Sequence, residues 1–170
     1  MDKTYVHYTV MKKELVASLN CDNQDKVYVD GTLGGGGHSE EILKRLNGKG
    51  ILFSFDVDAD AINHSKERLK GYENIKIIND SYTNIIENLE NEGIKQIDGG
   101  VIFDFGASYH QLTSENRGFS FKHDSKLDMR FDQNSELTAY EIVNKYKENE
   151  LVYIFSNYGE ERYSKRIARA

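Results

Sequence analysis

Apolar and polar residues alternate in blocks along the first hundred residues. Short runs rich in Val, Ile and Phe are separated by stretches in which apolar residues recur every three or four positions. The first kind of run is typical of buried strands, and the second kind of stretch is typical of amphipathic helices. The predicted strands are KVYVDGT (26–32), ILFSFDVD (51–58), NIKIIND (74–80) and DGGVIFDFG (98–106). The predicted helices are HSEEILKRLNGKG (38–50), ADAINHSKERLKG (59–71) and YTNIIENLENEG (82–93).

Strands and helices in this order predict βαβ units and a parallel sheet. We expect an α/β fold with a doubly wound sheet of strand order 3-2-1-4 over residues 1–107. The fourth strand would then form an edge, although its VIFDF run is strongly apolar. Because apolar edges are normally covered, we expect further strands beside it from sequence beyond residue 170. The sheet is therefore expected to be incomplete.

The pattern changes after Gly106. Residues 107–136 show little periodicity and predict a long polar loop. Thr138 and Glu141 have the spacing of a capping box at the start of a helix. The helices predicted after the loop are LTAYEIVNKYK (137–147), ENELVYIFSNYG (148–159) and EERYSKRIARA (160–170). We expect residues 108–170 to begin a helical domain, truncated here, that is inserted after strand four.

Composition limits the class of protein. The chain has 170 residues, of which 38% are hydrophobic, and this is enough for a packed core. The net charge of −6 argues against a broad basic surface, although residues 160–170 carry a net positive charge. The single cysteine, Cys21, excludes an internal disulfide and a cysteine zinc site, and we predict no metal. Neither a signal peptide nor a membrane span is visible, so we expect a cytoplasmic protein without a membrane partner.

Five glycines lie within the seven residues 31–37, at the junction of the first strand and the first helix. A glycine-rich segment is either a flexible linker or a loop whose backbone approaches a ligand closely. The position decides between them, because the first turn after a strand is where doubly wound sheets bind their ligands. We therefore predict a cofactor loop.

Two carboxylates help to choose the ligand. Asp56 lies twenty residues after Gly36 and could hold the ribose hydroxyls of any adenosine cofactor. Asp30, at the mouth of the loop, would repel a pyrophosphate and favour a cation. S-adenosylmethionine carries a sulfonium and an ammonium group and no phosphate, so the residues favour it over a nicotinamide dinucleotide. The alternative for Asp30 is a turn residue that bonds its own backbone.

Asp104 closes the predicted fourth strand, within the sequence DFG. Chemistry in doubly wound sheets gathers at the carboxyl ends of the strands. A carboxylate there could accept a hydrogen bond and a proton from an exocyclic amine, whose lone pair is otherwise delocalised into its ring. We therefore assign Asp104 as the candidate catalytic residue. The alternative is that it caps the segment that follows.

Several segments together resemble the RsmH/MraW family, and they extend in the same order over nearly the whole chain. They are HYTVMKKEL, YVDGTLGGGGHS, DGGVIFDFGAS, RGFSF, LDMRFD, LTAYEIVN and YGEERYSKRIARA. The resemblance implies a class I methyltransferase that uses S-adenosylmethionine. It also implies that the substrate is N4 of a cytidine in the decoding region of bacterial 16S rRNA, within the small ribosomal subunit.

The resemblance also implies roles for individual residues. The implied cofactor-binding residues are Gly36, Gly37, His38, Asp56, Tyr82 (where the family usually has Phe), Asp104 and Gln111, beside Asp30. This chain has Thr9, His110 and Lys126 where the family commonly has proline, so we expect freer loops near the substrate.

For RNA, exposed rings and guanidinium groups suit single-stranded bases, and Arg117, Phe119 and Phe121 are candidates. The alternative is that both phenylalanines anchor the long loop. Two other functions stay open: a methyltransferase for a small molecule or protein, and a truncated cofactor-binding module without turnover. A homodimer is open as well.

Overall fold

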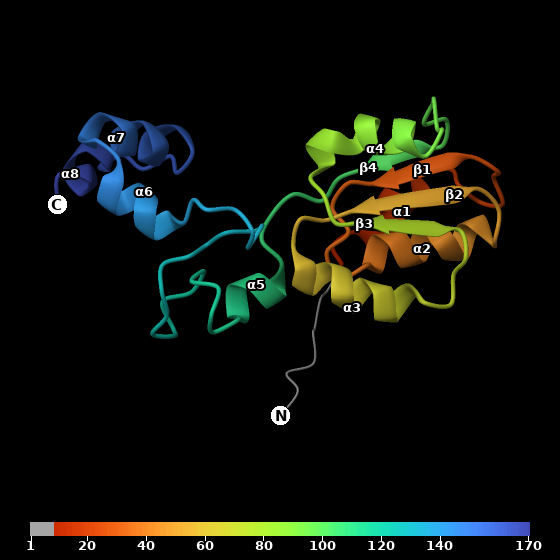
Figure 1. Ribbon diagram of the computed structural model, residues 1–170, viewed down its shortest axis with the longest axis horizontal. Coiled ribbons are helices and arrows are strands. Elements are labelled where there is room, and N and C mark those ends of the chain that lie inside the picture. Colours follow the sequence, from red (N-terminus) through yellow and green to blue (C-terminus); the bar gives the residue numbers. More distant parts are fainter. Residues whose placement is uncertain (1–8) are drawn as a thin grey trace. The chain divides into compact units, whose positions relative to one another are not determined.

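The computed structural model describes residues 9–170. They belong to two compact units, one that extends to Gln111 and one from Leu112 to Ala170 (Figure 1). The first unit contains a four-stranded parallel sheet of order β3-β2-β1-β4, which confirms the predicted doubly wound α/β fold and its strand order. The strands are β1 (Val27–Asp30), β2 (Ile51–Phe55), β3 (Ile75–Ile78) and β4 (Gly100–Ile102). The assignment of a cofactor-binding and a substrate-recognition domain stays a prediction.

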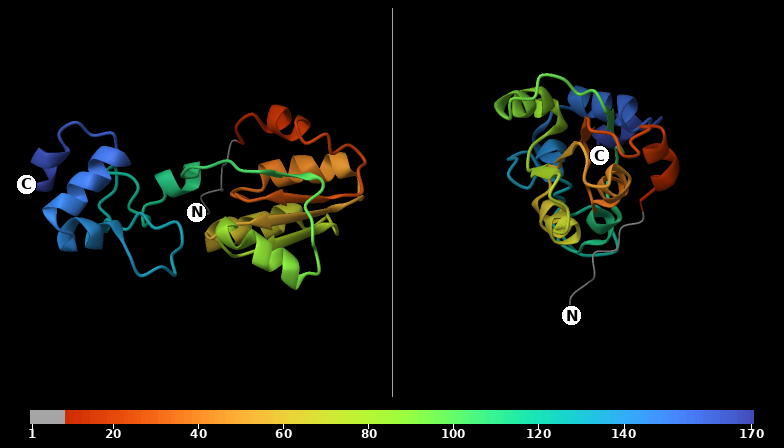
Figure 2. Two further views of the ribbon diagram at one scale, coloured as in Figure 1. Left: turned by 90° about the horizontal axis from the view of Figure 1, so that it is seen from above. Right: turned by 90° about the vertical axis from the view of Figure 1, so that its right-hand side faces the viewer.

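Helices cover both faces of the sheet (Figures 1 and 2). Side chains alternate along a strand, so neighbouring residues of β1 enter different cores. Tyr28 packs in a core with residues of α1 (Lys12–Ala17), α2 (Gly37–Leu46) and α3 (Ala59–Leu69). Val29 packs in the opposite core with residues of α4 (Ile85–Asn91), which a 3-10 turn, η1 (Tyr82–Asn84), precedes. Burial on both faces explains why the strand sequences are continuously apolar.

The sequence did not predict every element. Two short helices were missed, α1 and α5 (Tyr109–Thr113), because α1 starts after a left-handed Met11 without a side-chain cap and α5 lies within a polar stretch. The fourth strand is shorter than predicted and ends at Ile102. Asp104 therefore lies in the loop that follows, where its N–H donates to Thr32 Oγ1 at 2.7 Å instead of joining the sheet.

The second unit contains three helices, α6 (Ala139–Lys145), α7 (Glu148–Asn157) and α8 (Ser164–Ala168). The predicted capping box at the start of α6 is confirmed, with Thr138 and Glu141 bonding each other's main chain. Arg169, just after α8, donates to Glu148 at the start of α7 over 2.7 Å. Among residues 9–170, no helix combines the length and the apolar character that a membrane crossing requires.

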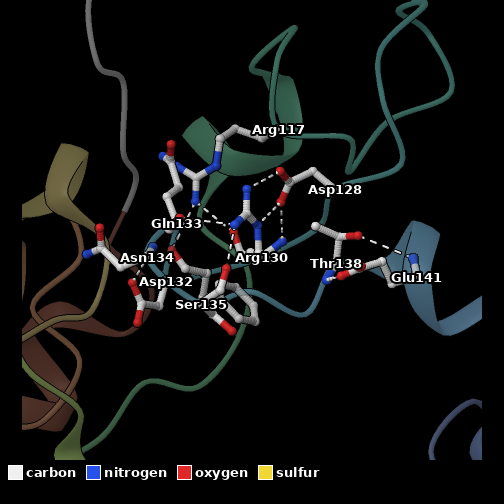
Figure 3. A network of polar contacts seen from close by, with 10 residues as sticks. Arg117, Asp128, Arg130, Asp132, Gln133, Asn134, Ser135, Thr138 and Glu141 are labelled. Atoms are coloured by element: carbon white, nitrogen blue, oxygen red, sulfur yellow. Dashed lines mark hydrogen bonds and ion pairs between the residues drawn. The ribbon is translucent and has the colours of Figure 1, made fainter.

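The long loop before α6 is folded around two guanidinium groups (Figure 3). Arg117 is buried, and its Nη2 donates to the carbonyl oxygens of Arg130 and Phe131 at 2.9 and 3.1 Å. Arg130 pairs bidentately with Asp128, at 2.8 and 2.7 Å, and this holds the pKa of the Asp128 carboxyl below its usual value. Arg130 also donates to the carbonyls of Gln133 and Ser135. Main-chain carbonyls in helices and strands accept hydrogen bonds from main-chain N–H groups. In this loop, the two guanidinium groups donate to several of the carbonyls instead.

Candidate cofactor-binding site

Three carboxylates follow neighbouring strands at one edge of the sheet. Asp30 ends β1 and stands level with Ser54 of β2 and Ile102 of β4. Asp56 comes directly after β2, and Asp104 lies two residues beyond β4. Since all strands are parallel, their carboxyl ends meet at this edge, which is where sheets of this kind bind ligands.

The glycine loop between β1 and α2 has no room for a side chain at Gly36 and Gly37. Gly34 and Gly36 have positive φ angles of 49° and 74°, which favour glycine. A Cβ atom on Gly37 would lie 1.8 Å from Thr9 Oγ1, and one on Gly36 would lie 2.9 Å from Ser65 Oγ. Gly36 is also the residue before α2, so the loop leads directly into a helix N-terminus. Tight packing on this scale excludes a flexible linker.

Asp30 lies beneath the loop rather than at its surface. Its side chain has no exposed area, and it accepts hydrogen bonds from Ser39 Oγ at 2.7 Å and from the Thr32 N–H at 3.1 Å. Ser39 Oγ also lies 2.8 Å from Ser54 Oγ. Burial raises the pKa of Asp30, and the hydrogen bond from Ser39 opposes this shift. Because Asp30 is fully buried, it can affect a ligand in two ways: through its charge and through the hydrogen bond that positions Thr32 in the loop.

Replacement of Asp30 by Asn should stabilise the fold at neutral pH. Because the pKa is raised in the folded chain, the folded state keeps this proton where the unfolded state has released it. The contribution of Asp30 to the free energy of unfolding is then lost as the pH rises. The loss begins at about pH 4, the pKa of Asp30 in the unfolded chain, and is complete above its pKa in the folded chain. We therefore expect Asp30→Asn to have a higher free energy of unfolding than the parent at pH 7.

The measurement is urea unfolding of both chains between pH 4 and pH 8. The difference between them should shrink toward the acid end. Asp56 also has a raised pKa and is present in both chains, and its charge is one of the causes that raise the pKa of Asp30, so the difference between the chains includes this interaction. An Asn variant that is less stable than the parent at pH 7 would contradict the prediction.

Asp56 holds the glycine loop from the neighbouring strand. Its Oδ2 accepts the N–H of Gly34 at 2.7 Å, and its Oδ1 accepts the N–H of Asp58 at 2.9 Å. Burial raises the pKa of Asp56, while these two backbone hydrogen bonds oppose the shift. Each carboxylate oxygen has a second lone pair, so Asp56 can bind the loop and accept ligand hydroxyls at the same time.

Asp56→Ala should weaken the binding of S-adenosylmethionine by about 1.5–3 kcal/mol, as expected for hydrogen bonds to a charged group. Calorimetry would measure this loss, together with the loss for an analogue that lacks both ribose hydroxyls. Because Asp56 also holds Gly34, both ligands should lose affinity, and the analogue should lose less. If both ligands lose the same binding free energy, Asp56 holds the glycine loop and does not bind the ribose hydroxyls.

His38, in the first turn of α2, lies between the main chain of Val10 and the carboxylate of Asp104. It is 4% exposed, and its Nε2 lies 3.0 Å from the carbonyl oxygen of Val10. A carbonyl only accepts, so Nε2 carries the proton of this hydrogen bond. Nδ1 of the same ring lies 3.9 Å from Asp104 Oδ2. Asp104 is 31% exposed, so its carboxylate is open to an incoming substrate.

Three exposed rings gather beside Asp104. Tyr82 meets Phe103 and Phe105 edge to face, at centroid distances of 5.7 and 5.4 Å, and the two phenylalanines stack at 5.2 Å. Phe103 also packs on Gly31, where a Cβ atom would lie 2.1 Å from its ring. The sequence predicted Tyr82 and missed the two phenylalanines. Their positions on either side of Asp104 were the available signal.

Gln111 is hydrogen-bonded to the segment that follows β2. Its Nε2 donates to Asp58 Oδ2 at 2.6 Å, and its Oε1 accepts the N–H of Ser108 at 2.8 Å. Asp58 also caps α3, where it accepts the N–H of Asp60. The structure thus connects Gln111 to the segment after β2 through Asp58, which the sequence did not indicate as a partner.

Comparison with known proteins places this geometry in a family. The model of the MraW methylase family matches residues 4–170. The chain belongs to this family. Two relatives are named "Ribosomal RNA small subunit methyltransferase H". The one from Clostridium botulinum (strain Loch Maree / Type A3) is 48% identical over 165 residues, which cover 97% of this chain and 53% of the relative. The one from Clostridioides difficile (strain 630) is 47% identical over 164 residues, with coverages of 96% and 52%.

The chain spans about half of the length of these MraW relatives. A solved structure, "Crystal Structure of PH0851", resembles it with a TM-score of 0.51 at 17% identity, over 60% of this chain and 22% of the other. At that identity, the likeness bears on the fold alone. It agrees with the doubly wound α/β arrangement described above.

Proposed function

We propose that this chain forms the S-adenosylmethionine site of an enzyme that methylates N4 of a cytidine in the decoding region of 16S rRNA. The small ribosomal subunit in the cytoplasm would be the substrate. The observation that carries the proposal is the meeting of three aspartates with a glycine loop that has no room for a side chain at Gly36 and Gly37, in a chain of the MraW family. The names of the relatives, which refer to the small-subunit RNA, support the choice of substrate.

The residues at the edge of the sheet fit the cofactor. Asp56 has lone pairs left for ribose hydroxyls, and the exposed ring of Tyr82 offers a face or edge to adenine. The residues from Gly34 to Gly37 have no side chains and lead into the N-terminus of α2, so their main chain could approach the amino-acid part closely. Asp30, buried beneath this loop, would favour a cationic ligand when it is ionised, and a nearby cation in turn favours the ionised form.

The cofactor, when bound, supplies a methyl group on a positively charged sulfur. In the transfer, the bond from carbon to sulfur breaks as the bond from carbon to N4 forms, and N4 releases one proton. Asp104 would accept a hydrogen bond from the amine and then this proton, because it is partly exposed and lies next to the loop. His38 Nδ1 lies 3.9 Å from the same carboxylate and would attract it only in a doubly protonated ring, because Nε2 already donates to Val10.

The second unit would contribute to RNA binding. Of the three candidates, Phe121 is fully exposed, whereas Arg117 is buried in the loop network and Phe119 packs on Phe131 at 5.6 Å. An exposed ring can stack on an unpaired base. Arg117 would therefore support the loop that presents Phe121.

Two measurements test the proposal. Calorimetry should detect binding of S-adenosylmethionine to the 170-residue chain. The second measurement uses cofactor with a labelled methyl group and a protein that contains this sequence and is as long as its relatives. This protein should transfer the methyl group to N4 of one cytidine in unmodified small ribosomal subunits. Label in protein or small molecules instead would favour a different methyltransferase. Binding without transfer to any of these substrates would favour a cofactor-binding module.

A further inference from the structure

Helix α3 contacts the glycine loop through two side chains that are almost one turn apart. Ser65 Oγ donates to the carbonyl oxygen of Gly34 at 2.8 Å. Arg68 Nη1 donates to the carbonyl oxygen of Gly35 at 2.9 Å. Residues three apart on a helix lie on the same face, so both can meet successive carbonyls of one loop. Neither residue was among those predicted for the site.

Arg68 also ties the loop to the start of α2. Its Nη2 and Nε donate to Glu40 Oε2 at 2.6 and 3.2 Å, and Glu40 lies in the first turn of α2. Lys44 donates to the other carboxylate oxygen at 2.8 Å. Hydrogen bonds from Lys44 and then from Arg68 lower the pKa of Glu40, so this carboxylate stays charged. One guanidinium thus fixes both a loop carbonyl and the helix that follows the loop.

These contacts set the direction of the loop's peptide groups. In a trans peptide, the carbonyl and the N–H of the next residue point opposite ways. Since α3 holds the carbonyls of Gly34 and Gly35, the N–H groups of Gly35 and Gly36 point away from α3. The N–H of Gly36 donates to the carbonyl oxygen of Leu33 at 2.8 Å and closes a turn within the loop, which leaves the N–H of Gly35 for a ligand. Gly34 is fixed on both sides, because its own N–H donates to Asp56 at 2.7 Å. The loop is therefore oriented by side chains from two other elements.

We infer that Ser65 and Arg68 are positioning residues for the cofactor loop. They hold its carbonyls against α3, so that its remaining main-chain surface is ready for the amino-acid part of the ligand. An unheld loop would have to be ordered during binding, and that cost lowers affinity. The inference rests on the proposed function in that it takes S-adenosylmethionine as the ligand.

The chain contains a matched control for Arg68. Arg45 of α2 pairs with Glu41 at 3.0 Å and donates to the carbonyl of Lys13 at 3.4 Å, and neither partner belongs to the glycine loop. The side chains of Arg68 and Arg45 are 29% and 23% exposed. Arg68→Gln and Arg45→Gln therefore remove the same kind of interaction from similar surroundings.

The test compares both variants by calorimetry with S-adenosylmethionine and by hydrogen exchange at the amides of residues 34–37. We expect Arg68→Gln to weaken binding about tenfold and to speed exchange in the loop, with Arg45→Gln close to the parent in both. Arg68→Lys keeps the charge and should recover part of the affinity. Ser65→Ala should speed exchange at Gly36, whose N–H donates to the carbonyl oxygen of Leu33 across the turn that Ser65 holds at Gly34.

The outcomes separate this inference from the function it rests on. Equal affinity losses in the two arginine variants would overturn the positioning role, as would unchanged loop exchange in both Arg68→Gln and Ser65→Ala. A parent chain that fails to bind S-adenosylmethionine would refute the proposed function. The exchange comparison would then still decide whether α3 orders the loop. If Arg68→Gln does not fold, Arg68→Lys and Ser65→Ala decide by the same two measurements.

Discussion

Asp104→Ala should slow methyl transfer by about 10²–10⁴-fold, the usual contribution of a general base. The amine of cytosine is a poor nucleophile, because its lone pair is shared with the ring. A carboxylate that accepts its hydrogen bond localises the lone pair and then takes the proton. Asp104 is placed for this, partly exposed beside the loop and held through its main chain by Thr32.

The assay measures single-turnover methyl transfer to small ribosomal subunits at saturating cofactor. The enzyme in this assay contains the present sequence and is as long as its relatives. Asp104→Asn separates charge from hydrogen bonding, since it keeps an acceptor and loses the negative charge. A slow Asn variant would show that the charge matters. Calorimetry distinguishes a lost chemical step from lost binding. If Asp104→Ala transfers methyl at the parent rate, Asp104 has no catalytic role.

Gly36→Val should weaken the binding of S-adenosylmethionine by about 100-fold or more, which corresponds to ~3 kcal/mol. Gly36 has a φ of 74°, and its Cβ would lie 2.9 Å from Ser65 Oγ and 3.4 Å from Leu69 Cδ1. Ser65 would have to turn away and give up its hydrogen bond to Gly34. The loop would lose its shape at the point where it enters α2.

Gly48→Val is the matched control for this change. Gly48 has a φ of 79°, and a Cβ there would have nothing within 4 Å. The control therefore has the same backbone strain without the crowding in the loop. Both variants should lose stability in thermal unfolding, but only Gly36→Val should lose cofactor affinity. Parallel losses of affinity would attribute the effect to general strain.

The sequence predicted the sheet well because the signal is local. Apolar runs and helical periodicity fall within single segments, and the parallel order follows from the alternation of these segments. The same reasoning put Asp30 at the mouth of the loop, where it is in fact buried beneath Ser39. Whether a residue after a strand faces solvent or core depends on the helix that packs over it.

The contacts of the loop could not be predicted in the same way. Ser65 and Arg68 lie about thirty residues after the glycines, and only the packing of α3 brings them to Gly34 and Gly35. In sequence they look like ordinary polar positions of an amphipathic helix. Arg117 shows the reverse case, since an arginine in a polar loop suggests an exposed contact, whereas its guanidinium is enclosed.

The way in which Arg117 and Arg130 organise their loop has a consequence for how this protein can evolve. Their donors reach the main-chain carbonyls of residues 130, 131, 133 and 135, and every amino acid offers such an acceptor. A substitution at Ser135, for example, changes the side chain that the loop displays and leaves its carbonyl in place as an anchor (Figure 3). The loop can thus acquire new specificity by mutation at positions whose identity does not determine its fold.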